Sequence, residues 1–189
     1  MADPFSSFDH PDYAEIVVIR HGETAWNADG RIQGHLDVEL NEVGRAQAAS
    51  VVKDPDLRER HLGDLQGISR REAAKTNPTA YRAMDRGQEI PGGGESLDQL
   101  SKRCTSALQR IGMKYLGKRV VVVTHGGVIR SLYKRANNKN KRCGMILNTS
   151  VNVFHLYEDK WIIKTWGDVS HLSQTGFLQS GFGGDRTSG

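Results

Sequence analysis

Two short apolar runs in this chain each end at a histidine that is followed by glycine. The first reads EIVVIRHG and the second reads RVVVVTHGG. Their apolar residues are mostly β-branched and do not alternate with polar ones, which is typical of strands covered on both faces. We therefore predict buried strands at residues 15–20 and 120–123. Each strand delivers a His-Gly pair to its carboxyl end.

Two capping signals precede stretches with helical spacing. Asn41 is a suitable N-cap for a helix over EVGRAQAASVV, which Gly44 weakens a little. Ser96 and Gln99 form a capping-box pattern before a second helix. The apolar stripe of that second helix is expected to lie in the core. Its members are Leu97, Leu100, Cys104, Leu108, Ile111 and Tyr115.

A third helix is predicted over residues 128–136, directly after the second His-Gly pair. Strand, glycine turn and helix in this order indicate an α/β fold with a largely parallel sheet. Near the end, VNVFHLY and WIIKTW flank the polar turn EDK, which predicts a hairpin. We interpret residues 1–12 as a polar leader and 173–189 as a flexible Gly- and Ser-rich tail, so that the folded domain covers 13–172.

Length and composition fit one globular domain. The chain has 189 residues, of which 37% are hydrophobic and 25% charged. No window approaches the roughly 18 uninterrupted apolar residues of a membrane span, so we expect no membrane partner. The first residues lack the basic start and apolar stretch of a secretory signal, which favours a cytoplasmic location.

The cysteines and the charge exclude some further classes. Cys104 and Cys143 are the two cysteines and form no C-x-x-C pair, so neither a disulfide framework nor a cysteine metal site is indicated. The formal net charge of +4 favours anionic partners. Much of this excess lies in YKRANNKNKR at 133–142, without interleaved aromatic residues, so we interpret it as a solvated loop and expect no nucleic acid partner.

The two strand ends suggest a binding site for an oxyanion. Ligands of open parallel sheets bind beyond the carboxyl ends of the strands, where His21 and His125 are both expected. A glycine after each histidine lets backbone amides come close to a ligand. Arg20 adds a planar fork of donors suited to phosphate or carboxylate. We therefore expect the two histidines to share one pocket.

Several motifs follow one another in the order known from one enzyme family. RHGETAWN is followed by RIQGHLDVELNEVGRAQA, by LRERHLGDLQG at 57–67, by PGGGES and by THGG. Over about residues 13–172 the chain resembles the histidine phosphatase superfamily, the phosphoglycerate-mutase-like proteins. The resemblance implies an α/β fold of three layers with a mostly parallel central sheet.

The resemblance also implies roles for individual residues. His21 would be the nucleophile that takes the phosphoryl group as a phosphohistidine, and it attacks in its neutral form. Glu59 would protonate the leaving oxygen and then activate water. Arg20 and His125 would stabilise the phosphoryl oxygens. Further phosphate contacts are expected from Gly22, Asn27, Gln33, Gly34 and Gly126.

Other residues compete for these roles. Glu95 in GGGES is an alternative acid, although a carboxylate beside a helix start has a simpler structural explanation. His35 and His61 raise the alternative of a metal site, but their spacing matches no common ligand motif. PGGGES lacks the Gly-Lys-Ser/Thr of a P-loop. We therefore expect neither a metal nor a cofactor.

The chain departs from the family pattern between Val52 and Asp54. Family members usually carry a further strand, a motif like Ser-Asp-Leu-x-Arg-Ala and a helix at this place, roughly 30 to 40 residues for a unit of this kind. We therefore expect a fold that is incomplete by one strand and one helix, with exposed apolar surface, a missing phosphate-binding arginine and impaired activity. The basic residues nearby, which do not replace it automatically, are Arg45, Lys53, Arg58 and Arg60.

The segment between the LQG and PGGGES motifs favours hydrolysis over mutase chemistry. ISRREAAKTNPTAYRAMDRGQEI is compact, whereas cofactor-dependent mutases carry a longer arginine-containing insertion there. The expected function is a metal-independent phosphomonoester hydrolase that acts on small phosphorylated metabolites, with a homo-oligomer as one state of the protein. The alternatives are a cofactor-dependent phosphoglycerate mutase and a non-catalytic remnant that binds phosphorylated ligands.

Overall fold

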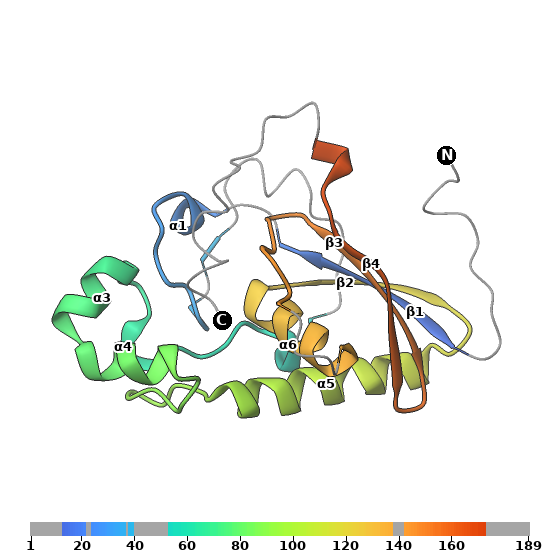
Figure 1. The fold of residues 1–189 in the computed structure, drawn as a ribbon, viewed down its shortest axis with the longest axis horizontal. Helices are drawn as coiled ribbons and strands as arrows, with labels where there is room; N and C mark the ends of the chain where they lie inside the picture. The colour runs from blue at the N-terminus through green and yellow to red at the C-terminus, as the bar shows by residue number, and fades with distance from the viewer. Residues whose placement is uncertain (1–12, 22–23, 37, 40–52, 138–141, 173–189) are drawn as a thin grey trace.

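The computed structural model of the chain is shown in Figure 1. It describes residues 13–21, 24–36, 38–39, 53–137 and 142–172. The helix expected after Asn41 lies outside the described residues, as do the leader and the tail, so these stay predictions. The boundaries of the domain are likewise untested.

Four strands form one sheet in the order β2-β1-β3-β4. They are β1 (Ala14–Arg20), β2 (Arg119–Thr124), β3 (Val151–Tyr157) and β4 (Lys160–Asp168). The two strands predicted from apolar runs and the C-terminal hairpin are thereby confirmed. The hairpin closes through a two-residue turn, in which Glu158 adopts a φ of 49°.

The sheet is mixed, so the prediction of a mostly parallel sheet is wrong for the described strands. β1 pairs with β2 in parallel, but β3 runs antiparallel to both β1 and β4. Before β3 begins, the chain returns to the carboxyl end of β1. There the Ser150 carbonyl accepts a hydrogen bond from the Arg20 amide, and Val151 at the start of β3 pairs with Ile19 near the end of β1. A two-residue turn then joins β3 to β4, and such a turn joins only antiparallel neighbours.

Two helices cover one face of the sheet. They are α5 (Leu97–Lys114) and α6 (Gly126–Ala136), and Figure 1 shows α5 running beneath the strands. Ser96 and Gln99 form the predicted capping box, with the Gln99 amide donating to the Ser96 hydroxyl at 3.1 Å. Most of the predicted stripe of α5 is buried or half-buried against the sheet, and only Tyr115 at its end is exposed.

The opposite face of β2 is half exposed, which corrects the expectation that this strand is covered on both faces. Val122 points into the core and is 6% exposed, but Val121 and Val123 are 51% and 50% exposed. These two valines pair in register with Val17 and Ile19 of β1. The described residues thus provide a core on one side of the sheet and a partly open apolar surface on the other.

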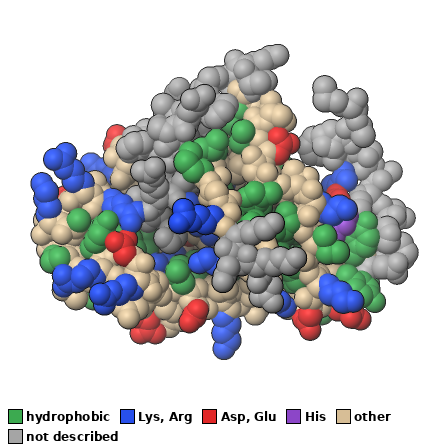
Figure 2. Space-filling view, viewed as in Figure 1, with side chains coloured by type: hydrophobic (Ala, Val, Ile, Leu, Met, Phe, Trp, Pro, Cys, Tyr) green, Lys and Arg blue, Asp and Glu red, His purple; other side chains and the backbone are tan. Residues whose placement is uncertain are grey.

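A smaller cluster of short elements lies beside the first core. It includes α3 (Arg70–Thr76) and α4 (Pro78–Asp85), with buried apolar residues of its own such as Leu65 and Met84. Figure 2 shows Lys and Arg side chains gathered at this end of the molecule. The remaining short elements are α1 (Ala25–Ala28), η1 (Pro55–Leu57), η2 (Gly63–Leu65) and η3 (Ser170–Leu172).

Neither cysteine of the described residues is in a disulfide. Cys104 is buried in α5 and Cys143 is half-buried. Burial raises the pKa of the Cys104 thiol to about 12, which makes it a packing residue rather than a nucleophile. None of the helices in the described parts of the chain is both long and apolar enough to span a bilayer.

Candidate active site

The parallel pairing of β1 with β2 places the two His-Gly sequences side by side. Arg20 is in register with Thr124, and the His21 amide donates to the Thr124 carbonyl at 2.8 Å. The imidazole rings of His21 and His125 follow directly, with centroids 4.8 Å apart and planes tilted by 56°. The structure therefore brings together the two histidines that the sequence analysis assigned to one pocket.

Arg20 places a buried cation beside this pair. It is the last residue of β1 and only 1% exposed, and its Nη1 donates to the Ile146 carbonyl at 2.8 Å. A guanidinium at such a depth is stabilised strongly by an anion, because little water is present to screen it. The site is thus prepared for a negatively charged ligand.

The N-terminus of α6 faces the same place. His125 is its N-cap in an extended conformation, its own side chain makes no capping hydrogen bond, and the first turn of the helix contains no acidic residue. Gly126 and Gly127 follow and are buried. Amide donors at a helix N-terminus add partial positive charge, which favours a phosphate or another anion.

The surroundings of His125 disfavour its protonated, imidazolium form. Burial lowers the pKa of His125 well below its usual range, and the neighbouring His21 and Arg20 lower it further. The His125 ring is therefore neutral at pH 7 in the absence of ligand. A bound phosphate dianion would counteract the effect of the positive charge of Arg20.

The carboxyl group of Glu59 is hydrogen-bonded to the first turn of α6, next to His125. It is 4% exposed, and its Oε2 accepts the Gly127 amide at 3.0 Å. Its Oε1 accepts the Arg60 amide at 2.7 Å. Burial raises the pKa of Glu59, although these two amides and nearby arginines act in the opposite direction. A carboxyl group with a raised pKa is better suited to general acid catalysis near neutral pH than one with an ordinary pKa.

Glu95, the alternative acid, is occupied by other contacts. Its carboxylate forms an ion pair with Arg103 and accepts the His61 amide at 2.8 Å. Burial alone would raise the pKa of Glu95, but these hydrogen bonds and the positive charge of Arg103 lower it overall. A carboxylate that stays ionised is a poor proton donor, so the structure favours Glu59 for this role.

The other predicted phosphate ligands have local structural roles where they are described. The side-chain oxygen of Asn27 accepts from the Thr24 backbone amide at 3.1 Å in the capping box of α1, and from the Thr24 hydroxyl at 2.9 Å. The Gln33 side chain contacts the same hydroxyl at 3.2 Å. Gly34 has a φ of 56° and lies against Gln66, which accounts for a glycine there. Gly22 lies outside the described residues, and phosphate binding by this set stays a prediction.

His35 and His61 pack edge to face, with ring centroids 4.7 Å apart. His35 Nε2 lies 3.7 Å from a Glu95 carboxylate oxygen. Burial lowers the pKa of His35, although hydrogen bonding to the Glu59 backbone and the Glu95 charge raise it in part. In the described parts of the chain, no group of three or more His, Cys, Asp or Glu side chains is arranged to hold a metal ion.

The basic residues near the shortened junction are engaged elsewhere or lie outside the described residues. Arg60 is fully buried and donates to the carbonyls of Glu95, Met84 and Gln88. Arg58 donates to the His35 carbonyl. Lys53 is exposed, and Arg45 is not among the described residues. Arg60 therefore stabilises the loops rather than standing in for a phosphate ligand.

Sequence reasoning missed Arg103. It lies on α5 and its side chain reaches Glu95 and the chain around Glu59. One signal for it was present in the sequence. Arg103 directly precedes Cys104, a member of the apolar stripe of α5, and so lies at the edge of a buried helix face. A charged residue beside a buried helix face requires a partner.

Comparison with known proteins places this chain in a described family. The model of the histidine phosphatase superfamily (branch 1) matches residues 16–53 and 49–169. Phosphoglycerate mutase-like protein 4 of Arabidopsis thaliana is 56% identical over 219 aligned residues, covering 94% of this chain and 95% of that protein. The metal-independent phosphoserine phosphatase of the same plant is 46% identical over 214 aligned residues, covering 92% of this chain and 90% of that protein.

Solved structures agree with this comparison. A mycobacterial glucosyl-3-phosphoglycerate phosphatase in complex with VO3 superposes with a TM-score of 0.65 at 26% sequence identity. The match covers 81% of this chain and 98% of that one. The likeness in fold therefore extends over nearly the whole of the solved protein.

The alignments also support the predicted gap. The alignment to the mutase-like relative has 219 positions, 30 more than the 189 residues of this chain, so part of that relative has no counterpart here. The family model matches in two pieces that meet at 49–53, beside the junction between Val52 and Asp54. The chain is shortened there relative to its relatives.

Proposed function

Because the chain belongs to the histidine phosphatase superfamily, we propose that it hydrolyses small phosphomonoesters through a phosphohistidine at His21. The observation that carries this proposal is the meeting of two strand ends and one loop. His21 and His125 are in ring contact, and the Glu59 carboxyl is hydrogen-bonded to the amide two residues after His125. The groups that we propose as nucleophile, anion site and proton donor thus lie together.

The first half of the reaction transfers the phosphoryl group to the enzyme. A neutral His21 nitrogen attacks phosphorus, the new P–N bond forms, and the P–O bond to the leaving group breaks. Glu59 gives its proton to the leaving oxygen. Arg20, the His125 ring and the N-terminus of α6 stabilise the charge on the phosphoryl oxygens.

The second half returns the enzyme to its starting state. Water attacks phosphorus and loses a proton to the Glu59 carboxylate, while the P–N bond to His21 breaks. Inorganic phosphate leaves and Glu59 is protonated again. The same residue therefore serves as acid and as base, for which a raised pKa is favourable.

The substrate class follows from the charge of the site and from the relatives. A site with a buried arginine and a helix N-terminus favours small anionic phosphate esters. One relative is named for phosphoserine phosphatase activity, which makes phosphoserine the first candidate substrate. A cytoplasmic location and a homo-oligomer remain parts of this proposal that fractionation and light scattering would test.

A panel of phosphate esters tests the proposal directly. Purified protein is assayed for phosphate release from phosphoserine, 3-phosphoglycerate and p-nitrophenyl phosphate, with and without a chelator. We expect release of inorganic phosphate that the chelator does not abolish. Conversion of 3-phosphoglycerate to its isomer would instead support a mutase. Phosphate binding without turnover of any ester would support the non-catalytic alternative.

The His21→Ala variant tests the nucleophile. We expect loss of at least about 10³-fold in kcat, because no other group can carry the phosphoryl transfer. Rapid quenching without acid and mass mapping should find phosphate on His21 in the unaltered protein only. His171→Ala, which alters an exposed histidine near the C-terminal end of the described residues, serves as the control. Full activity of His21→Ala would contradict the assignment.

A further inference from the structure

The segment that carries Glu59 has little regular structure of its own. The short helical turn η1 covers Pro55–Leu57, and the backbone is already extended at Arg58. Buried carbonyl groups of such a segment need donors from elsewhere in the chain. The guanidinium of Arg103 on α5 supplies them.

All five N–H groups of Arg103 have partners among the described residues. Nη1 donates to the carbonyls of Asp56 and Arg58, at 2.7 and 2.9 Å. Nη2 donates to the carbonyl of Glu59 at 2.8 Å. The two donors on the other edge, one on Nε and one on Nη2, hold the Glu95 carboxylate at 2.6 and 2.8 Å. One planar group therefore joins α5 to three carbonyls around Glu59.

Glu95 sets the orientation of this planar group. A bidentate carboxylate fixes the plane of a guanidinium and hence the direction of its remaining donors. Glu95 lies just before the N-cap of α5, and its carboxylate accepts a hydrogen bond from the His61 amide. Lysine at position 103 would keep the charge, but its three donors radiate from one nitrogen and cannot reproduce the planar fork.

The backbone at Glu59 determines where its carboxyl group points. Both carboxyl oxygens are bound to amides, those of Arg60 and Gly127. We propose that Arg103, oriented by Glu95, is a positioning residue that holds the Glu59 backbone so that the carboxyl faces the oxygen leaving phosphorus. The proposal rests on the proposed function, in which Glu59 is the acid. A misplacement of about 1 Å in such a group can cost about 100-fold in rate.

Position and charge are separable at this site. Burial raises the pKa of Glu59, while the amides of Gly127 and Arg60 and the charges of Arg20 and Arg103 lower it. Arg103→Lys keeps the charge and removes the fork. Arg103→Gln removes both. Comparison of the two variants therefore distinguishes lost geometry from an altered pKa.

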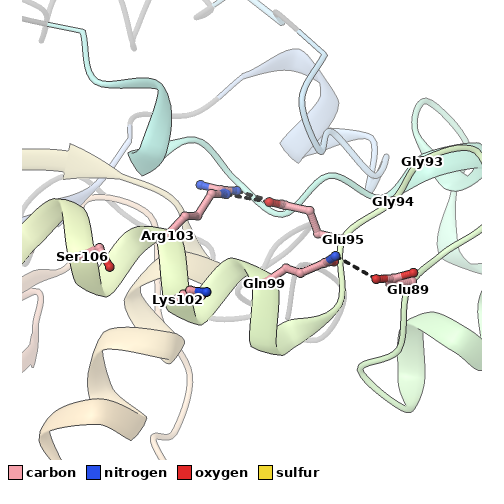
Figure 3. A pocket seen from close by; sticks show the side chains of 8 residues that line it. All are labelled: Glu89, Gly93, Gly94, Glu95, Gln99, Lys102, Arg103 and Ser106. Atoms are coloured by element: carbon pink, nitrogen blue, oxygen red, sulfur yellow. Dashed lines mark hydrogen bonds and ion pairs between the residues drawn. The ribbon is translucent and has the colours of Figure 1, made fainter.

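The outer side of the ion pair is accessible from solvent. Figure 3 shows Arg103 from α5 and Glu95 from the preceding loop pointing toward each other at the wall of a pocket of about 670 Å³. Gln99 and Lys102 also line this pocket, together with the glycines of the PGGGES loop. A small ion can therefore reach the space that an Arg103→Ala variant would leave, which permits chemical rescue by guanidinium.

The kinetic test compares two leaving groups. Arg103→Lys and Arg103→Gln are assayed on phosphoserine, whose alkoxide needs a proton, and on p-nitrophenyl phosphate, whose leaving group needs none. We expect kcat on phosphoserine to fall about 10- to 100-fold and kcat on the aryl ester to fall less than about 3-fold, with KM changed little. Arg110→Lys is the matched control, because Arg110 lies on the same helix and binds the carboxylates of Asp54 and Asp56.

Two further measurements keep the test independent of a single variant. Millimolar guanidinium should restore part of the phosphoserine activity of Arg103→Ala and leave Arg110→Ala unchanged. Carbon-13 NMR of labelled glutamate, with the Glu59 signal assigned by its absence in Glu59→Gln, reports the pKa of Glu59 without turnover. We expect this pKa to rise in Arg103→Gln and to stay near its original value in Arg103→Lys.

The outcomes separate this inference from the proposed function. If the unaltered protein hydrolyses no ester, the proposed function fails, and the inference that rests on it fails with it. If the unaltered protein is active but the Arg103 variants lose kcat equally on both substrates, or on neither, Arg103 only stabilises the fold and the positioning role is refuted. Preferential loss on phosphoserine, with guanidinium rescue, supports it.

Discussion

Glu59 and Glu95 show how the surroundings of a carboxyl group decide its chemistry. Both side chains are buried or half-buried, and both accept backbone amides. Glu95 also binds a guanidinium directly, which lowers its pKa, whereas burial dominates at Glu59 and raises its pKa. The pKa values of the two carboxyl groups are thus shifted in opposite directions, in line with the proposed roles of Glu59 as the acid and Glu95 as a structural partner.

Substitution of the acid should depend on the leaving group. Glu59→Gln is expected to lower kcat on phosphoserine by about 10² to 10⁴, the usual contribution of general acid catalysis. The loss on p-nitrophenyl phosphate should be much smaller, because that leaving group is stable as an anion. Steady-state kinetics on the two esters measure the difference. Equal losses on both would indicate that Glu59 has a structural role.

The lowered pKa of His125 predicts how stability depends on pH. Because its pKa is lower in the folded state than the usual value of about 6.5, the unfolded chain binds the proton more tightly. The contribution of a neutral His125 is therefore fully present above about pH 6.5 and is lost as the pH falls toward the lower folded value.

His125→Gln should flatten this pH dependence. Below about pH 6.5, removal of one titrating group should reduce the slope of unfolding free energy against pH by up to about 1.4 kcal/mol per pH unit. Urea titrations between pH 5 and 7.5, in buffers without phosphate, measure the slope. His171→Gln provides the comparison for an exposed histidine. An unchanged slope would mean that His125 titrates alike in both states.

At the scale of elements, β2 is the strand on which the structure differs most from the sequence pattern. A run of four valines predicts burial on both faces, but α5 and α6 cover one face only. The same substitution at neighbouring positions therefore tests two environments, one in the core and one half in solvent.

Val122→Thr and Val121→Thr form this matched pair. We expect Val122→Thr to lower the free energy of unfolding by about 1 to 3 kcal/mol, because it places a hydroxyl group in the core. Val121→Thr should change it by less than about 0.5 kcal/mol, as is usual at exposed positions. Urea denaturation of both variants measures the difference. A similar cost at both positions would show that the second face is covered in solution.

Local signals in the sequence predicted much of the fold. The capping box at Ser96, the apolar stripe of α5 and the turn after Tyr157 each depend on residues close together in the chain, and each is confirmed. The start signals of α3 and α4 were also present, since Ser69 and Asn77 accept amides of their first turns. The two helices were not predicted, although these caps mark their first turns.

The parts that could not be predicted depend on contacts between distant residues. Arg103 binds carbonyl groups 44 to 47 residues earlier in the chain, and no periodicity reports such contacts. The antiparallel direction of β3 depends on the route that the chain takes after α6, which apolar patterns do not specify. The pairing of His21 with His125 was predictable because parallel strands align their carboxyl ends.

At the scale of the whole molecule, the shortened junction links stability to activity. Val121 and Val123 are half exposed, and covering a few hundred square ångströms of such surface is worth several kcal/mol at about 25 cal/mol per Å². The net stability of a typical domain is only about 5 to 15 kcal/mol. Loss of the family arginine would separately weaken phosphate binding.

Two chimaeras distinguish these effects. The first inserts a family-type strand-helix segment carrying Ser-Asp-Leu-x-Arg-Ala between Val52 and Asp54, and the second carries the same segment with its arginine changed to glutamine. Both should melt at least about 5 °C higher and bind less hydrophobic dye, because both cover the open sheet face. Only the first should gain in kcat/KM for phosphoserine, by roughly a few hundredfold, since one charged donor in an oxyanion site contributes about 3 to 4 kcal/mol. Calorimetry and steady-state kinetics report the two quantities independently.

If the original chain melts as high, stays monomeric and works as fast as both chimaeras, then Arg20, His125 and the N-terminus of α6 suffice for catalysis and the missing segment is dispensable.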